Sequence, residues 1–171
     1  MKNVIKFVLI ISLVCFSISV NAQTKPKFGH VDFAKLYSLM PGQDSAQIEY
    51  QEFAQSLKNT LDAMQAELES KYQDYQTSVN TLSAIIRSTK EKEIQDLQGR
   101  IEEFQMSAQQ ELQNKEGELT KPIIDKASQA VKEVAEENGY TYIFNSSEGM
   151  LLYSDPGDDV LSLVKKKLGI E

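Results

Sequence analysis

Apolar residues recur at helical spacing through the middle of the chain, separated mostly by glutamine, glutamate, serine and lysine. They follow one another at intervals of three and four residues, with a gap after Ile86. This spacing is typical of a narrow coiled-coil seam, and helices so polar cannot enclose a globular core by themselves. The pattern therefore predicts long helices that pair along one stripe. The residues of this seam are Leu57, Leu61, Met64, Leu68, Tyr72, Tyr75, Val79, Leu82, Ile86, Ile94, Leu97, Ile101, Phe104, Ala108 and Leu112.

The gap in the seam between Ile86 and Ile94 predicts where the helical segment reverses. A straight helix rises about 1.5 Å per residue, so it would separate the two ends of the chain by more than about 100 Å. A reversal would bring those ends together, although the gap contains neither glycine nor proline. We therefore predict an antiparallel coiled-coil arm over residues 43–121, with its tip near residues 87–92.

Short strands are predicted on both sides of the arm. One strand lies in "FGHVDF", and "TYIFNSSEGMLLYS" reads as two strands joined by a tight turn. Residues 122–138 form an apolar helix that ends at Gly139, and Asp155 with Pro156 begins a closing helix. The expected fold class is α+β, in which residues 23–42 and 122–171 form a small β-sheet body that carries the arm.

Both faces of this small sheet carry apolar side chains, and three strands leave two open edges. Proteins rarely leave such edges unprotected, and joining several copies into a closed barrel removes them. The pattern predicts a homo-oligomer with an intersubunit barrel, whereas the alternative is a monomer with an exposed apolar patch. The residues expected in the oligomer body are Val31, Phe33, Tyr142, Phe144 and Leu152.

The first 22 residues have the features of a cleavable signal peptide. Lys2 and Lys6 precede an apolar stretch, and small residues end it at Ala22. A lipoprotein signal ending at Cys15 is the alternative. Cleavage after residue 22 leaves no cysteine and 16 basic against 25 acidic side chains, a net charge of −9. An acidic exported protein is not a general binder of nucleic acid, and contact with a membrane surface is left open.

No pattern in the sequence points to catalysis, a cofactor or a metal. The chain has no phosphate-binding glycine loop and a single histidine, His30, which is a structural strand residue or a pH sensor. Asp158 and Asp159 lie at a helix start, where acidic groups are favoured. Asn145 begins an N-S-S pattern that glycan acceptors share, although the pattern is common by chance. We therefore expect a protein that is not an enzyme and needs no cofactor.

Two segments carry a family resemblance. "KPIIDKASQAVKEVAEENGYTYIFNSSEGMLLYSD" and "FGHVDFAKLYSLMPGQDSAQ" resemble the two ends of the Skp (OmpH) family of periplasmic outer-membrane-protein chaperones. The resemblance covers residues 25–169. It implies a periplasmic trimer whose arms form a cage that holds unfolded outer-membrane proteins without ATP. Well-known members are basic and bind lipopolysaccharide through clustered basic side chains, so for this acidic chain no such site is carried over.

The arm surface supplies candidate contacts for such clients. Between residues 43 and 120 there are 15 acidic and 7 basic side chains, and three of the basic ones lie at the predicted tip. Salt should weaken client capture if these tip charges matter. The off-seam apolar side chains are either client contacts or part of the arm packing. The candidate client-binding residues are Ile85, Ile86, Met106, Arg87, Lys90 and Lys92.

A second reading of the same pattern is a structural coiled-coil scaffold or spacer of the cell envelope. Such a protein would have a fixed partner and no preference for unfolded chains.

Overall fold

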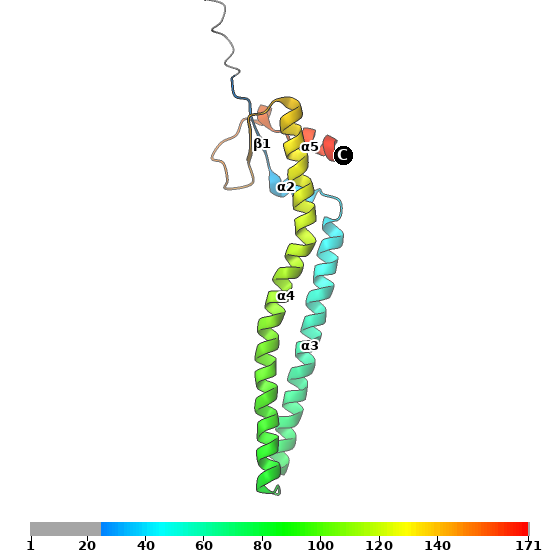
Figure 1. Ribbon diagram of the computed structural model, residues 1–171, viewed down its shortest axis with the longest axis vertical. Coiled ribbons are helices and arrows are strands. Elements are labelled where there is room, and N and C mark those ends of the chain that lie inside the picture. The colour runs from blue at the N-terminus through cyan, green and yellow to red at the C-terminus, as the bar shows by residue number, and fades with distance from the viewer. Residues whose placement is uncertain (1–24, 171) are drawn as a thin grey trace, which may run out of the picture.

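The protein consists of a long helical arm and a small body at its base (Figure 1). The computed structural model describes residues 25–170, so the predicted signal peptide and Cys15 lie outside it. The elements in chain order are β1 (Phe28–Val31), α2 (Phe33–Ser38), α3 (Gln43–Ser78), α4 (Ala84–Asn138), β2 (Tyr142–Asn145), the short 3-10 helix η1 (Pro156–Asp158) and α5 (Leu161–Leu168).

Helices α3 and α4 pack against each other as an antiparallel pair, which confirms the predicted helical hairpin (Figure 1). Leu97 of α4 is fully buried in the seam, and Ile94 and Ile101 are nearly so. No residue of α3 is buried to the same degree. The arm is therefore a two-helix structure with one thin apolar stripe, and most of its side chains face solvent.

The arm reverses at residues 79–83, not near residues 87–92. Ser83 begins α4 as its N-cap, where its side chain accepts a hydrogen bond from the Ile86 backbone N–H at 3.4 Å. Serine is a favoured N-cap residue, so Ser83 marks the start of α4 in the sequence although the turn contains neither glycine nor proline. Residues 87–92 instead form the second turn of α4.

Polar contacts between the two helices take the place of apolar contacts where the seam has its gap. Near the tip, Lys90 pairs with Asp74, and the Tyr75 hydroxyl donates to Glu91. The pKa of Tyr75 is raised, mainly because the neighbouring carboxylate accepts its proton in a hydrogen bond. These side chains join α3 to α4 where apolar contacts are missing, so the helical pair continues through the gap.

Helix α4 continues beyond the arm into the body without interruption, for 55 residues in all. Pro122 lies inside it and faces solvent, whereas the adjacent Ile123 is buried. A proline removes one backbone hydrogen bond from a helix interior. Packing of the following apolar stripe against the body holds the helix together past this point.

The sheet contains two parallel strands, β1 and β2, in place of the expected three. Phe28 pairs with Tyr142 and Val31 with Asn145, so the N-terminal and C-terminal ends of the chain meet as predicted. The predicted second strand of the hairpin, around Leu152, does not form. Residues 146–155 instead form a loop whose two ends are hydrogen-bonded to the His30 ring.

The body has one compact apolar core. Helix α2, the second half of α4 and α5 surround β1 there, and two ion pairs from Lys167 to Glu133 and Glu137 tie α5 to α4. Gly29 is required in β1, because an added Cβ would lie 2.9 Å from the Tyr140 ring. The buried residues are Val31, Leu36, Met40, Ile123, Ala127, Ala130, Val134, Val160 and Val164.

The N-terminus of α2 is capped by side chains from two parts of the chain. Asp32 accepts hydrogen bonds from the Lys35 backbone N–H at 3.0 Å and from the Ser147 hydroxyl at 2.9 Å. Asn145 accepts from the backbone N–H of Phe33 at 3.3 Å, so its side chain has a structural role in the fold. The hydrogen bonds that Asp32 accepts lower its pKa. The bond from the Lys35 backbone N–H has the largest effect, followed by the bond from the Ser147 hydroxyl.

Because the folded protein lowers the pKa of Asp32, the ionised carboxylate stabilises the fold. This contribution is present above the ordinary value of 3.8 and is lost as the pH falls through the lowered pKa. Asp32→Asn keeps an acceptor but removes the charge. We expect Asp32→Asn to be less stable than the parent at neutral pH, with the difference disappearing in strong acid. Urea unfolding followed by circular dichroism across this range measures it, and a difference independent of pH would contradict the assignment.

Candidate functional site

One face of the two-stranded sheet is an exposed aromatic surface, the sheet face, made of Phe28, Tyr142 and Phe144. The three rings lie together, with centroids 6.1 Å apart for Phe28 and Tyr142 and 6.2 Å apart for the other two pairs. Tyr142 is 60% exposed, and both phenylalanines are also exposed. Aromatic rings usually supply much of the energy of a core or an interface, so three of them stacked in solvent indicate a surface that another element covers.

Beside the sheet face lies a loop of residues 146–155, the 146–155 loop, whose two ends are held by a single imidazole. Nε2 of the nearly buried His30 donates to the Asp155 carbonyl at 2.9 Å, because a carbonyl can only accept. Nδ1 of the same ring is hydrogen-bonded to the Ser146 hydroxyl at 3.0 Å. His30 is therefore a structural residue that fixes where the loop leaves the body and where it returns.

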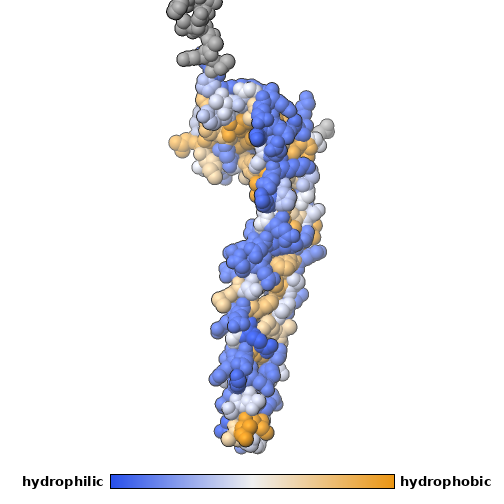
Figure 2. Space-filling model, in the orientation of Figure 1, coloured by the Kyte–Doolittle hydropathy of each residue, from blue (hydrophilic) through white to orange (hydrophobic). Residues whose placement is uncertain are grey.

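The 146–155 loop presents apolar side chains to solvent. Leu152 is fully exposed, at 110%, and Met150 and Tyr153 are also largely free. A hollow of about 380 Å³ separates this loop from the sheet face, with Leu151 and Tyr153 on one wall and Phe28 and Phe144 on the other. Figure 2 shows apolar surface gathered on this part of the body, in contrast to the polar arm. The loop, the hollow and the open edge of β2 form one continuous apolar region.

The structure divides the residues that were expected in the oligomer body. Tyr142 and Phe144 lie on the sheet face, and Leu152 projects from the 146–155 loop. Val31, by contrast, is buried in the core of its own subunit, and Phe33 begins α2 and packs against that core. The sequence analysis missed Phe28, although its alternation with His30 in β1 places it on the same face as the aromatic residues of β2.

The arm tip presents two exposed isoleucines, and the cations near it contact other residues of the arm. Ile85 is 81% exposed and Ile86 is half-exposed, and Figure 2 shows apolar surface at the end of the arm. Arg87 is exposed, and its guanidinium donates to the Val79 carbonyl at 3.2 Å, across the turn. Lys90 pairs with Asp74, and Lys92 lies 3.6 Å from Asp96.

The six predicted client contacts are therefore not one site. Met106 is exposed on α4, about 30 Å along the helix from Ile85 at about 1.5 Å per residue. The isoleucines form one apolar tip, and Met106 is a separate apolar residue on the shaft. The three cations make contacts within the arm.

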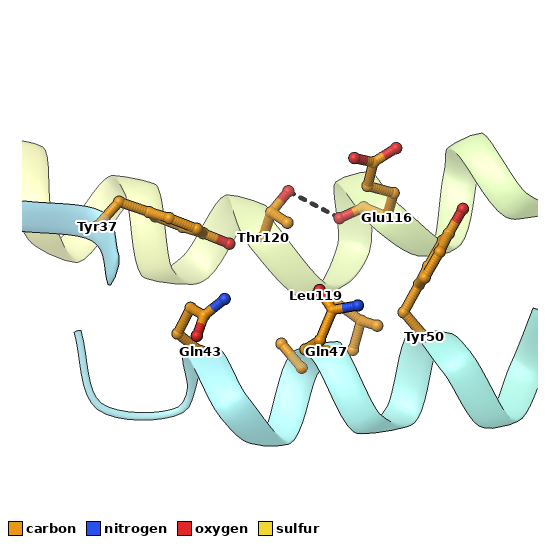
Figure 3. Close-up of a pocket in the computed structure, with 8 residues that line it drawn as sticks. Tyr37, Gln43, Gln47, Tyr50, Glu116, Leu119 and Thr120 are labelled. Carbon is orange, nitrogen blue, oxygen red and sulfur yellow. Dashed lines mark hydrogen bonds between the residues drawn. The ribbon is translucent and has the colours of Figure 1, made fainter. Parts of the chain in front are cut away.

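A groove lies where the arm joins the body (Figure 3). It has a volume of about 230 Å³ and is lined by side chains of α2, α3 and α4, among them Tyr37, Gln47 and Tyr50. The Thr120 hydroxyl donates to the Glu116 carbonyl within it, at 2.7 Å. A second groove of about 500 Å³ shares Tyr37 and Thr120 and continues towards the 146–155 loop.

The lining of these grooves combines amides, hydroxyls and the Glu116 carboxylate with aromatic and aliphatic side chains. Within residues 25–170, no three histidine, cysteine, aspartate or glutamate side chains are grouped as a metal site would require. Over the same range, none of the helices has both the length and the apolarity needed to cross a bilayer.

Arg87→Gln should loosen the arm tip, because Val79 loses a hydrogen bond that closes the turn. If the free energy of local opening at the tip falls by about 1 kcal/mol, the rate of amide hydrogen exchange rises about fivefold. The increase should be confined to the last turns of α3 and the first turn of α4. Hydrogen exchange read by mass spectrometry resolves this region. Arg100→Gln is the matched control, since Arg100 makes no ion pair among residues 25–170. Unchanged exchange in Arg87→Gln would mean that the contact does not stabilise the tip.

Comparison with known proteins gives one consistent result. A family model described as "Outer membrane protein (OmpH-like)" matches residues 27–168. The Chaperone protein Skp of Photorhabdus laumondii is 25% identical over 158 residues, covering 91% of this chain and 93% of that protein. Skp of Pectobacterium atrosepticum is 26% identical over 152 residues, covering 86% of this chain and 90% of that protein. The crystal structure of a putative OmpH-like outer membrane chaperone from Caulobacter crescentus superimposes with a TM-score of 0.71, at 10% identity and 86% coverage of both chains, which shows a shared fold.

Proposed function

This chain belongs to the OmpH-like outer membrane protein family, and from that premise we propose that it is an ATP-independent holdase for unfolded outer-membrane proteins. The family is one of chaperones and not of enzymes. The proposal places the protein in the periplasm after removal of residues 1–22. The observation that carries it is the pairing of an apolar, uncovered body surface with a long polar arm that has almost no core of its own.

The body surface supports assembly into an oligomer. The sheet face and the 146–155 loop are continuous, and the edge of β2 that faces away from β1 has no partner strand among residues 25–170. Each aromatic side chain can bury about 150–250 Å², so covering three half-exposed rings contributes on the order of 5 kcal/mol per subunit. A second copy offers matching apolar surface from its own loop. We infer a closed homo-oligomer, with a trimer as the state that the family resemblance implies.

The arms then supply the client-holding surface. Several arms that project from one body enclose a shared space, and their exposed Ile85, Ile86 and Met106 offer scattered apolar contacts. Contacts that are weak one by one gain strength when several arms act on the same unfolded chain. Such a surface holds an unfolded client without offering it a strand edge on which to aggregate.

A test of assembly changes one exposed residue of the sheet face, Tyr142, and the most exposed residue of the 146–155 loop, Leu152, to serine. We expect the double variant to sediment as single subunits, since it loses apolar area that only another copy can cover. Its helix content should stay near that of the parent, because the arm lies outside this surface. Ile48→Ser is the control, because Ile48 is 56% exposed, close to the 60% of Tyr142, but lies on α3. Should the parent protein itself sediment as a single subunit, the proposed assembly is wrong.

The holdase activity is tested by diluting a urea-unfolded outer-membrane protein into buffer without ATP and following light scattering. We expect the chain to suppress aggregation at about one oligomer per client, through the avidity of several arms. A structural scaffold of the envelope would leave the scattering unchanged, and that result would reject the chaperone proposal in favour of the scaffold. Adding ATP should make no difference, since the sequence has no phosphate-binding glycine loop.

A further inference from the structure

Most positive charges of the arm have a partner within the arm. The five lysines between residues 43 and 120 all lie within ion-pair distance of an acidic side chain, and Arg87 donates to the Val79 carbonyl, whereas Arg100 makes no ion pair among residues 25–170. At the arm base, Lys115 lies 2.6 Å from Glu49, and the pKa of Lys115 is raised mainly by that hydrogen bond. The pairs are Lys58–Asp62, Lys71–Glu93, Lys90–Asp74, Lys92–Asp96 and Lys115–Glu49.

The negative charges of the arm are mostly not neutralised in this way. Of the 15 acidic side chains between residues 43 and 120, nine have no cation within ion-pair distance among residues 25–170. They are spread along both helices and do not form one cluster. A client therefore meets free carboxylates along the whole arm and almost no free cation. These nine are Asp44, Glu52, Glu67, Glu69, Glu91, Glu102, Glu103, Glu111 and Glu116.

Exposed apolar side chains lie within the same anionic surface. Met106 follows Glu102 and Glu103 by one turn of α4, and Ile85 and Ile86 end the arm. Methionine makes adaptable contacts that suit many partners. An unfolded segment that carries lysine or arginine next to apolar residues can satisfy both features at once, whereas an acidic segment must bring like charges together.

We propose that the arms select clients by charge, and that they hold unfolded segments that combine basic and apolar residues. This inference rests on the proposed holdase function and names the class of chain that the arms prefer. Oppositely charged partners are attracted over a distance set by the salt concentration, which raises the encounter rate before any close contact forms. The selection is therefore strongest at low ionic strength and weakens as salt is added.

The test compares two unfolded polypeptides of equal length and hydropathy, one with lysine and one with glutamate at every charged position. Fluorescence anisotropy measures their binding to the intact protein at about 0.01 M and about 0.1 M salt, where the Debye length falls from about 30 Å to about 10 Å. We expect the lysine polypeptide to bind about tenfold more tightly at the lower salt concentration. The ratio should shrink at the higher one.

Two matched variants separate charge from shape. Changing Glu52, Glu67, Glu102 and Glu103 to glutamine should reduce the preference for the lysine polypeptide. The reciprocal variant changes four exposed glutamines to glutamate and should increase it; these are Gln51, Gln65, Gln105 and Gln109. Both variants alter side chains that form no ion pair among residues 25–170, so the arm should keep its helix content. Circular dichroism of each variant against the parent protein checks this.

The outcomes distinguish this inference from the function on which it rests. Equal binding of the two polypeptides, or tighter binding of the glutamate form, overturns the charge selection while leaving the holdase intact. If neither polypeptide binds and an unfolded outer-membrane protein also aggregates freely, the holdase proposal fails as well. A lysine preference that both variants leave unchanged would place the selective charge outside the arm and overturn the inference.

Discussion

Reversal of the helical arm is the constraint on which the rest of the structure depends. Phe28 and Tyr142 pair in parallel strands although they lie at opposite ends of the described chain. Bringing such distant segments together costs loop-closure entropy, and the arm lowers that cost by fixing the intervening chain as two antiparallel helices. Its thin apolar stripe and the cross-helix contacts near the tip hold this geometry, with Leu97 at the centre of the stripe and the pair Lys90–Asp74 near the turn.

The body has a packed core on one face of the sheet and an uncovered aromatic surface on the other. Nine buried residues form its core against β1, but the opposite face of the sheet leaves three aromatic rings in solvent. The imidazole of His30 holds the 146–155 loop beside this face by both ends. Fold and exposed surface thus share one cause, because a two-stranded sheet has too little area to cover both of its faces with its own helices.

The charged side chains of the arm have two roles: some pair the two helices, and the others keep the arm hydrated. Packing two polar helices along a thin stripe benefits from cross-helix pairs such as Lys71–Glu93 and Lys115–Glu49, which involve several of the arm's few cations. The remaining acidic groups keep the arm soluble and highly hydrated. The same imbalance gives the arm a net negative surface that also carries a few exposed apolar side chains.

The sequence by itself determined the paired helices, the meeting of the two chain ends and the exposed aromatic face, because apolar periodicity directly reports which side of an element is buried. It also indicated that Tyr142, Phe144 and Leu152 lie outside the subunit core. Only the tertiary structure decided the position of the turn, the burial of Val31 and the partners that Arg87 and Lys90 contact. Those features depend on which partner a side chain meets across the fold, and a cation that reaches a carbonyl or a carboxylate on the other helix looks the same in sequence as one that faces solvent.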